Sequence, residues 1–414
     1  MYKLNRRKPL IAGILLVFLL LAAGIGWAME TGRYSDLGQM PIIVTIVKNE
    51  YVDPPSTLQL LSAYVKTGNV NGMLKVLGDP YTYYMDPETY EEMHTTTSGS
   101  YEGIGVIIGL RDDKIIVVAP FEGTPGDKAG LKPEDVIVAV DGNSTEGMTL
   151  QQTVNLIKGS RGTAVTITIE RGQDGVQKDI NIIRDGIKIP SVDSVLLEDG
   201  IGYIRLITFS EDTDIELDKA VNKLRQEGAK GFVLDLRLNP GGLLSTALRI
   251  TDKFIKDGPI LHVVYKNDEK QTFWASPWSN VNEPVVVLVD KGSASASEIL
   301  SGALQDSGRA ILVGTRTFGK GKVQSVVPLH DGSALSVTVA KYLTAGGRDI
   351  NDKGIEPDVV VELPELNDDT TTSGEDEIQE SIEDTQLLKA IEILKRTMSG
   401  EINAIEGLAL KKAS

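Results

Sequence analysis

The chain has 414 residues, 41% of them hydrophobic and 24% charged, a composition typical of folded globular domains and not of intrinsically disordered chains. Its 58 acidic and 42 basic residues give a formal net charge of −16, which argues against a nucleic-acid-binding protein. The absence of cysteine excludes disulfides and thiol nucleophiles, and only three histidines are present, His94, His262 and His330.

The first 29 residues combine a basic start with an uncharged apolar run. Residues 1–8 hold four basic and no acidic side chains, and residues 9–29 carry no charge. About 20 apolar residues span a bilayer as a helix, and positive flanks stay cytoplasmic. The alternative is a secretory signal peptide, because Gly26-Trp27-Ala28 offers small residues to signal peptidase. We expect a single-pass cell-membrane protein with its catalytic domains on the extracytoplasmic side, or a secreted protein if residues 1–29 are cleaved off.

Residues 30–94 are predicted to form a small helical domain. Apolar residues recur at helical spacing in this block, at Ile43 and Ile46 and again between Leu58 and Leu77. The expected task of this domain is packing or dimerisation, so a homodimer is one predicted assembly.

In residues 95–186 the apolar residues occur in short runs typical of β-strands. The predicted strands are Ile104–Leu110, Ile115–Ala119, Val136–Val140 and Val165–Ile169, with a helix, Leu150–Lys158, between the last two. The phrase Gly103-Ile104-Gly105-Val106 is not a dinucleotide fingerprint, because no helix follows it. A loop of exposed backbone N–H groups before an edge strand instead captures the terminal carboxylate of a peptide by strand addition. We therefore assign peptide binding to Gly103, Ile104, Gly105 and Val106.

Residues 187–362 alternate between strand-like and helical segments. The predicted strands are Ile201–Ile207, Gly231–Leu236, Ile260–Val264, Val285–Val289 and Ile311–Gly314, and the predicted helices are Ile215–Gln226, Leu243–Phe254 and Ala294–Leu304. This alternation predicts an α/β layer with a substantially parallel sheet. Active groups in such sheets gather at the carboxyl ends of the strands.

The end of the chain, residues 363–414, differs in composition from the rest. Nine acids and no base lie between Pro364 and Gln386, which indicates a solvated acidic linker. Apolar residues then recur at helical spacing from Leu387 to Leu394, so a short amphipathic C-terminal helix should follow.

Two strand ends carry candidate chemistry. One strand runs into Asn239-Pro240-Gly241-Gly242, and another runs into a turn that holds Ser293, Ser295 and Ser297 at the start of a helix. Helix N-termini favour negative charge, and negative charge develops when a hydroxyl attacks a carbonyl group. Serine is also a good N-cap, however, so one of these three hydroxyls can have only that role.

No histidine lies in a glycine-framed turn, so lysine is the alternative base. Lysine can serve when burial lowers its pKa enough to leave a free amine near neutral pH. The turn Phe318-Gly319-Lys320-Gly321-Lys322 offers two such lysines. Gly314 to Lys320 also matches the start of a phosphate-binding loop, but Gly321 stands where Ser or Thr would bind Mg²⁺ and a strand follows in place of a helix.

Four motifs follow one another in the α/β block. They are Asn239-Pro240-Gly241-Gly242, Gly292-Ser293-Ala294-Ser295-Ala296-Ser297-Glu298-Ile299, Ala303-Leu304-Gln305-Asp306 and Thr317-Phe318-Gly319-Lys320-Gly321-Lys322-Val323-Gln324. Together they resemble the carboxyl-terminal processing peptidases, which are serine peptidases with a PDZ domain and a Ser–Lys dyad. The block 95–186, with Gly123-Thr124-Pro125-Gly126 and Asp141-Gly142, looks like the PDZ domain of that family.

The resemblance implies roles for five residues. Ser295 would be the nucleophile and Lys320 its general base, and Gln324 corresponds to the glutamine that orients the lysine. The backbone N–H groups of Gly241 and Ala296 would form the oxyanion hole.

Spacing by itself leaves the choice of lysine open. Lys320, Lys322 and Gln324 point to one side of a strand, so alternation does not distinguish the two lysines. The flanking glycines favour Lys320 as the inward-facing one, and Lys322 is expected to be a solvated side chain.

Three neighbouring residues have expected structural roles. Asp306 lies about three helical turns after the candidate nucleophile and is expected to hold the helix or a nearby base. Glu298 is interpreted as a first-turn acid that favours the helix dipole. Leu238 departs from the polar residue common in the family but leaves the adjacent glycines in place.

The prediction for the whole chain is an exported serine-type endopeptidase that recognises apolar protein C-termini through its PDZ domain. The expected fold is multidomain, α/β and β, with an N-terminal membrane anchor, a small helical domain, a PDZ domain and an α/β peptidase core. No metal or organic cofactor is required, and the expected partners are protein or peptide substrates and the membrane, not nucleic acid. The alternative is a catalytically inactive, membrane-tethered PDZ scaffold. A trypsin-like PDZ protease is excluded, because its His-Asp-Ser order is absent.

Overall fold

The structure is a computed structural model. It describes residues 36–172, 175–277, 279–363 and 384–402. The predicted membrane segment and most of the acidic linker lie outside the described residues. Within those ranges, no helix has both the length and the apolarity needed to cross a membrane.

Contacts divide the chain into two compact units. The first comprises residues 1–92, 231–241 and 247–414, and the second comprises residues 93–230 and 242–246. The candidate residues Gly241, Ser295 and Lys320 all lie in the first unit, whereas the predicted peptide-binding loop lies in the second.

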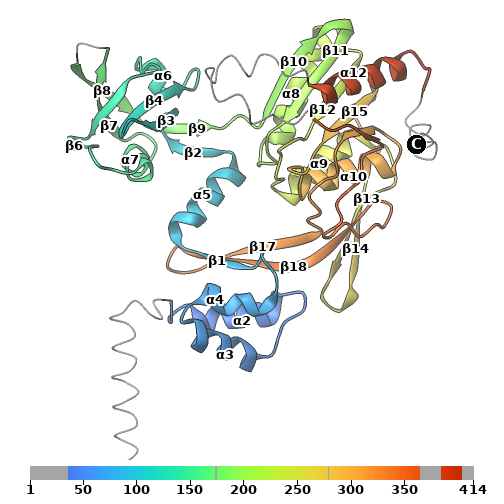
Figure 1. The fold of residues 1–414 in the computed structure, drawn as a ribbon, viewed down its shortest axis with the longest axis horizontal. Coiled ribbons are helices and arrows are strands. Elements are labelled where there is room, and N and C mark those ends of the chain that lie inside the picture. The colour runs from blue at the N-terminus through green and yellow to red at the C-terminus, as the bar shows by residue number, and fades with distance from the viewer. Residues whose placement is uncertain (1–35, 173–174, 278, 364–383, 403–414) are drawn as a thin grey trace, which may run out of the picture. The chain divides into compact units, whose positions relative to one another are not determined.

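A parallel sheet occupies the core of the first unit (Figure 1). The strands of this sheet that belong to the first unit are, in order, β12 (Gly231–Asp235), β15 (Val285–Val289), β16 (Ile311–Gly314) and β19 (Val359–Val360). Every residue of β12, β15 and β16 is buried, as expected for strands whose two faces are both covered. The helices that follow these strands in sequence include α9 (Leu244–Phe254), α10 (Ala296–Asp306) and α12 (Thr385–Met398), and α12 contacts all three buried strands. The predicted parallel sheet and C-terminal helix are confirmed.

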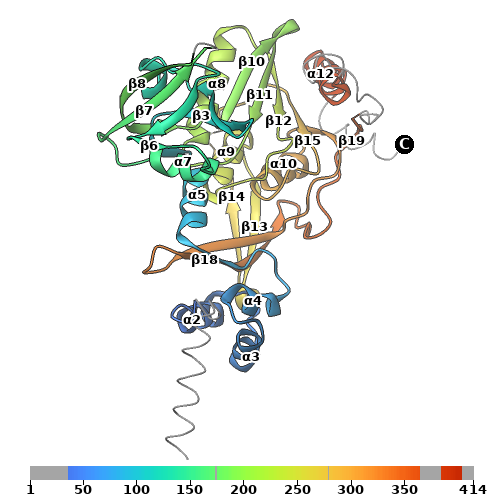
Figure 2. The ribbon, with the colours of Figure 1, turned by 60° about the vertical axis from the view of Figure 1, so that its left-hand side comes forward.

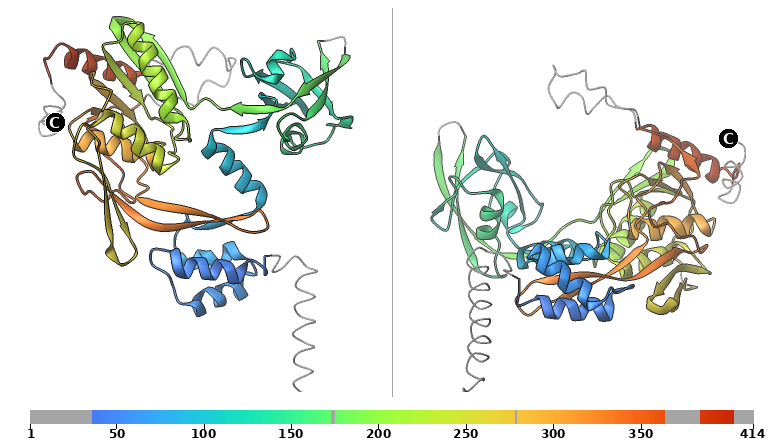
Figure 3. Two further views of the ribbon diagram at one scale, coloured as in Figure 1. Left: turned by 180° about the vertical axis from the view of Figure 1, so that it is seen from behind. Right: turned by 60° about the horizontal axis from the view of Figure 1, so that its bottom comes forward.

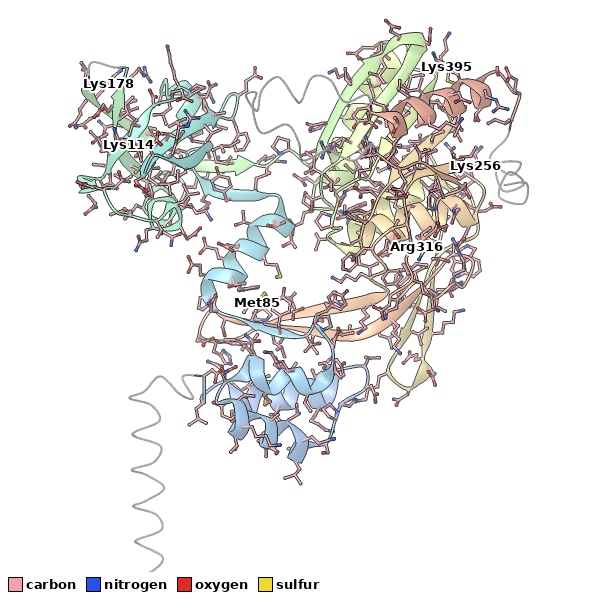
Figure 4. All side chains as sticks on the ribbon, viewed as in Figure 1. Met85, Lys114, Lys178, Lys256, Arg316 and Lys395 are labelled. Atoms are coloured by element: carbon pink, nitrogen blue, oxygen red, sulfur yellow. The ribbon has the colours of Figure 1, made fainter. Side chains whose placement is uncertain are left out.

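A second sheet in the same unit is antiparallel. Its order is β1, β18, β13, β14, with β17 paired to β18, and its strands are β1 (Tyr83–Met85), β13 (Pro259–Tyr265), β14 (Lys270–Trp274), β17 (Lys322–Pro328) and β18 (Ala334–Thr344). The segment Ile260–Val264 was expected in the parallel layer, but it lies in this sheet, because it forms a hairpin with β14 and pairs with β18. Met85, labelled in Figure 4, is buried on β1.

The N-terminal helices pack on the antiparallel sheet (Figure 3). They are α2 (Met40–Glu50), α3 (Thr57–Thr67), α4 (Val70–Leu74) and the 3₁₀ turn η1 (Lys75–Leu77). The helix α5 (Pro87–Ser98) follows β1. Ile43 and Leu60 from these helices share one apolar cluster with Leu335 and Val337 of β18. The helical prediction is therefore confirmed, although the block also contributes the strand β1.

The second unit contains an antiparallel sheet of order β3, β4, β5, β7, β8, with β6 paired to β5 (Figure 2). The elements are β2 (Ser100–Gly103), β3 (Val106–Arg111), β4 (Lys114–Pro120), α6 (Pro125–Lys128), β5 (Val136–Val140), β6 (Asn143–Ser144), α7 (Leu150–Ile157), β7 (Ala164–Arg171), β8 (Val176–Ile183) and β9 (Asp185–Lys188). Buried side chains at alternate positions of β7, Val165, Ile167 and Ile169, form part of its core. The strands β2, β6, β8 and β9 were absent from the prediction. The same unit also holds β10 (Val192–Leu197), β11 (Ile201–Leu206) and α8 (Thr213–Gln226).

Candidate active site

Ser295 stands at the start of α10 in a strained backbone conformation. Its φ of 53° and ψ of −111° are rare for a residue with a Cβ atom. A strained serine in a sharp turn from strand to helix is the geometry by which hydrolases expose a nucleophilic hydroxyl. Ser295 occupies such a turn, because it follows β15 and precedes α10.

The two neighbouring serines have structural roles. Ser293 and Ser297 are both fully buried. The Ser293 hydroxyl donates to the Leu236 carbonyl at 2.8 Å, and the Ser297 hydroxyl donates to the Asn239 carbonyl at 3.0 Å. Of the three serines in this turn, only Ser295 is partly exposed to solvent.

Glu298 joins the serine turn to the lysine turn. Its buried carboxylate accepts at Oε2 from the backbone N–H groups of Ser295, at 3.0 Å, and Lys320, at 2.9 Å. At Oε1 it accepts from the Thr317 hydroxyl, at 2.6 Å, and the Gly319 N–H, at 2.7 Å. The sequence indicated a favourable charge at the helix N-terminus, but the structure shows a carboxylate that also binds the serine turn to the lysine turn.

Lys320 lies in a site that favours its neutral form. Its Nζ is 4.7 Å from the centre of the Tyr81 ring. Burial lowers the pKa of Lys320, and this effect outweighs the opposing charges of Asp79 and Glu298. A lowered pKa raises the fraction of neutral amine at a given pH, and only the neutral amine can take a proton from a hydroxyl.

Lys322 is not the solvated side chain that the sequence suggested. Its Nζ is 3.0 Å from Oδ1 of Asp79, and the side chains of the two residues are 19% and 1% exposed. The prediction was wrong because Asp79 approaches from the N-terminal block, 243 residues away in sequence. The structure therefore distinguishes the two lysines, since one is ion-paired and the other has a lowered pKa.

Asp79 was not identified from the sequence. Burial by itself would raise the pKa of Asp79, but hydrogen bonds from Thr338, Thr82 and Lys322 outweigh it and leave this pKa lowered. The hydroxyl of Thr82 donates to Oδ2 of Asp79 at 2.7 Å. The carboxylate is thus charged and held by several donors.

Gln324 and Asp306 have different surroundings. Gln324 lies on β17, and its Nε2 donates to the Thr338 hydroxyl at 3.4 Å. Asp306, at the end of α10, accepts from the Gly346 N–H at 2.6 Å and pairs with Arg348. Asp306 therefore has the structural role that was expected of it.

Gly241 and Ala296, the two predicted oxyanion donors, lie side by side. Gly241 has a φ of +103°, and a Cβ added there would lie 2.7 Å from the Ala294 carbonyl oxygen and 2.9 Å from the Ala296 nitrogen. Only glycine fits against the serine turn at this position. In this structure the Gly241 N–H donates to Oδ1 of Asn239 at 2.9 Å. Ala296 is the first residue of α10 and is fully buried.

The predicted peptide-binding loop of the second unit is anchored through two of its carbonyl groups. The Ile104 carbonyl accepts from the Gly126 N–H at 2.7 Å, and the Gly105 carbonyl accepts from the Phe121 N–H at 2.9 Å. Gly105 has a φ of +74°, which few other residues adopt. The loop runs into β3, which is an edge strand of its sheet, as predicted. The loop was also expected to be exposed, but Gly103, Ile104 and Gly105 are buried.

Tyr101 is a further residue of this loop that the sequence did not reveal. A Cβ on Gly103 would lie 2.9 Å from Cε2 of the Tyr101 ring, so the ring covers that glycine. Burial raises the pKa of Tyr101, against hydrogen bonds from the backbone N–H groups of Val106 and Gly105. The signal available in the sequence was an aromatic residue two positions before the glycine phrase.

Comparison with known proteins agrees with this architecture. Three family models match the chain: an activating protease CtpB N-terminal domain over residues 28–89, a PDZ domain over residues 116–171 and peptidase family S41 over residues 200–361. The carboxy-terminal processing protease CtpA of Bacillus subtilis is 44% identical over 299 residues, which are 72% of this chain and 64% of the relative. The carboxy-terminal-processing protease of Bartonella bacilliformis is 39% identical over 389 residues, which are 91% of this chain and 88% of the relative. The chain belongs to the carboxyl-terminal processing protease family, the serine peptidases of family S41 with a PDZ domain.

Proposed function

We propose that this chain is an exported endopeptidase that binds apolar protein C-termini at residues 103–106 and cleaves peptide bonds with Ser295 and Lys320. The observation that carries the proposal is the buried Glu298 carboxylate, one oxygen of which binds the backbones of both residues. The lowered pKa of Lys320 supports its role as the base.

In the proposed reaction, Ser295 attacks the carbonyl carbon of the scissile bond while the neutral amine of Lys320 takes its proton. The resulting oxyanion would accept from the N–H groups of Ala296 and Gly241, replacing Oδ1 of Asn239 at the latter. Lys320 would then protonate the departing amine. A water molecule then gives a proton to Lys320 and attacks the carbonyl carbon of the acyl-enzyme. Lys320 passes this proton to the Ser295 oxygen as the acyl group leaves, and the Ser295 hydroxyl is restored.

Gln324 is proposed to orient Lys320 once substrate is bound. In this structure its amide donates weakly to Thr338, at 3.4 Å, a contact that is easily exchanged. A Gln324→Ala variant should therefore lower kcat more than it raises KM.

Cleavage of an unstructured protein by the purified full chain tests the dyad. Ser295→Ala and Lys320→Ala should each lose about 1,000-fold or more in kcat/KM. Lys322→Ala, which removes the other lysine of the turn, should retain more activity than Lys320→Ala. Cleavage at the parent rate by Ser295→Ala or Lys320→Ala would refute the dyad. A parent chain that binds peptides without cleaving any protein would establish the alternative, an inactive PDZ scaffold.

The membrane anchor and the homodimer stay proposals about the intact protein. The uncharged run of residues 9–29 after a basic start supports insertion with the catalytic domains outside the cytoplasm. Membrane fractionation, with mass spectrometry of the N-terminus, should find either the intact chain in membranes or an exported chain that starts near residue 29. The intact chain in the cytosolic fraction would contradict both forms of the proposal. Sedimentation of the purified chain tests the dimer.

A further inference from the structure

The segment of residues 79–82 forms one wall of the lysine site. It comes from the N-terminal block, between η1 and β1, and β18 anchors it by two hydrogen bonds. The Ser336 hydroxyl donates to the Tyr81 carbonyl at 2.9 Å, and the Thr338 N–H donates to the Thr82 hydroxyl at 3.0 Å. These bonds hold the side chains of the segment against both lysines.

Both lysine side chains converge on Tyr81. The Nζ atoms of Lys320 and Lys322 lie 4.7 Å and 5.6 Å from the centre of its ring. Asp79 takes only one of them, since its Oδ1 is 3.0 Å from Nζ of Lys322. The segment therefore pairs with Lys322 through Asp79 and contacts Lys320 through the Tyr81 ring, although the two lysines are only two positions apart.

We propose that Asp79 and Tyr81 are positioning residues for Lys320. The ion pair of Asp79 with Lys322 keeps an unpaired charge away from the Lys320 amine, and the Tyr81 ring keeps water away from it. This inference rests on the proposed Ser295–Lys320 dyad. It assigns the N-terminal block a part in the chemistry, in addition to packing.

The electrostatic argument depends on the charges that face Lys320. Glu298 of α10 acts on it with both carboxylate oxygens occupied by donors, Asp79 acts on it from the N-terminal block, and Lys322 follows it on β17. An unpaired carboxylate close to an amine favours the ammonium form. Because Lys322 compensates the charge of Asp79, Lys320 lies beside an ion pair instead of a bare carboxylate.

The Tyr81 ring supplies the second part of the effect. Its phenol is neutral, because burial, followed by the charges of Asp352, Asp79 and Glu298, raises the pKa of Tyr81. An aromatic face attracts an ammonium, but the same ring excludes water from the amine, and desolvation is the stronger effect at buried lysines. The ring should therefore favour the neutral amine overall.

The test is the pH dependence of kcat/KM for cleavage of an unstructured protein by the full chain. Its acidic limb reports the pKa of the base in the free enzyme. Lys322→Gln leaves the Asp79 carboxylate without its ion-pair partner and should move this limb to higher pH, by about one pH unit. Asp79→Asn leaves the Lys322 ammonium without its ion-pair partner and should move it to lower pH. The double variant should return the limb close to its position in the parent.

Opposite displacements are the diagnostic result, since general damage to the fold would not move the limb in two directions. Tyr81→Ala should move the limb to higher pH because water enters, and Tyr81→Phe, which keeps the ring, should not move it. If one variant does not fold, the other ion-pair variant and the Tyr81 pair still decide the matter.

An unchanged limb in Lys322→Gln, Asp79→Asn and Tyr81→Ala, or displacement in one direction by both ion-pair variants, would overturn the inference. The parent and Ser295→Ala serve as reference. If Ser295→Ala still cleaves, the proposed dyad fails. If it does not cleave while the limb stays fixed in the other variants, only the role of Asp79 and Tyr81 fails.

Discussion

The peptidase site and the peptide-binding loop are built in different ways. The peptidase site joins segments from four places in the chain, around residues 79–82, 239–241, 293–298 and 317–324, through buried carboxylates and backbone contacts. The peptide-binding loop is a single tetrapeptide whose carbonyl groups bond to Phe121 and Gly126, about twenty residues further on. A change at one contact of the peptidase site should therefore act on distant segments, whereas a change in the loop should act locally.

Of the changes that test this difference between the two sites, Gly241→Ala is expected to have the largest effect, a loss in kcat. A new Cβ would lie 2.7 Å from the Ala294 carbonyl oxygen and 2.9 Å from the Ser295 Cβ, so it must displace the serine turn. Loss of one aligned oxyanion donor costs about 100- to 1,000-fold in kcat. Gly258→Ala is the matched control, because Gly258 has a similar φ of +95° and nothing within 4 Å of the added atom. Equal kcat values in the two variants would show that the contact across segments is unimportant.

The next largest effect is expected from Glu298→Gln, because Glu298 connects the serine turn to the lysine turn. An amide cannot accept from three backbone N–H groups and the Thr317 hydroxyl without placing its own N–H₂ against a donor. We expect a loss of about 100-fold in kcat/KM from misplaced groups. The free energy of unfolding should fall by about 3 kcal/mol, as measured with denaturant.

The control for this change is Glu356→Gln. Glu356 forms an exposed ion pair with Arg316, so its replacement should alter stability by less than about 1 kcal/mol. If Glu298→Gln were as active and as stable as this control, the carboxylate would not be the link between the two turns.

A local effect is expected from Gly105→Ala in the peptide-binding loop. The added Cβ would lie 2.4 Å from the Cβ of Thr124, at a φ of +74°. Binding of a labelled peptide with an apolar C-terminus should weaken about tenfold, which is about 1.4 kcal/mol. Gly123→Ala, with a φ of +73° and open space around the new atom, should bind nearly as the parent does. Fluorescence anisotropy measures peptide binding by both variants. If Gly123→Ala bound the peptide as weakly as Gly105→Ala, the contact with Thr124 would not explain the loss.

The smallest effect is expected at the start of the C-terminal helix, where Arg237 pairs with Asp384. The guanidinium of Arg237 donates to both carboxylate oxygens of Asp384, at 2.9 Å and 2.8 Å. Burial opposes ionisation of Asp384, but hydrogen bonds from Arg237 and Leu387 leave its pKa lowered. Asp384→Asn should cost about 1 kcal/mol of unfolding free energy at neutral pH, because the pair is partly exposed.

The sign of the pH dependence follows from that lowered pKa. A carboxylate whose pKa is lower in the folded protein stabilises it above the unfolded pKa, about 3.9, and loses this contribution as the pH falls through the folded pKa. The difference between parent and Asp384→Asn should therefore be full at pH 6 and shrink below about pH 4. A difference independent of pH, in denaturant titrations, would contradict the ion pair.

The accuracy of the sequence-based fold prediction depended on how far apart the partners lie. Val285–Val289 and Ile311–Gly314 were predicted with the bounds that the structure shows, because unbroken apolar runs mark strands buried on both faces. Ile260–Val264 was placed in the wrong sheet, because β18, one of its two partner strands, lies about eighty residues later. No local pattern reveals such a pairing.

The same limit applies to the candidate site. The serine and lysine turns were recognisable because each is a short glycine-framed phrase. The ion pair of Lys322 with Asp79 was missed, because neither residue carries a local sign of a partner 243 positions away. Glu298 was read as a helix-dipole residue, and its bonds to the lysine turn became visible only in three dimensions.

Covalent labelling of the full chain by a fluorophosphonate tests the central claim most directly, that Ser295 is a nucleophile activated by Lys320. Mass spectrometry should find one adduct, on Ser295, with a labelling rate that rises with pH. In Lys320→Met the rate should fall by about 100-fold or more. An adduct on Ser293 or Ser297, or labelling of Lys320→Met at the parent rate, would contradict the account.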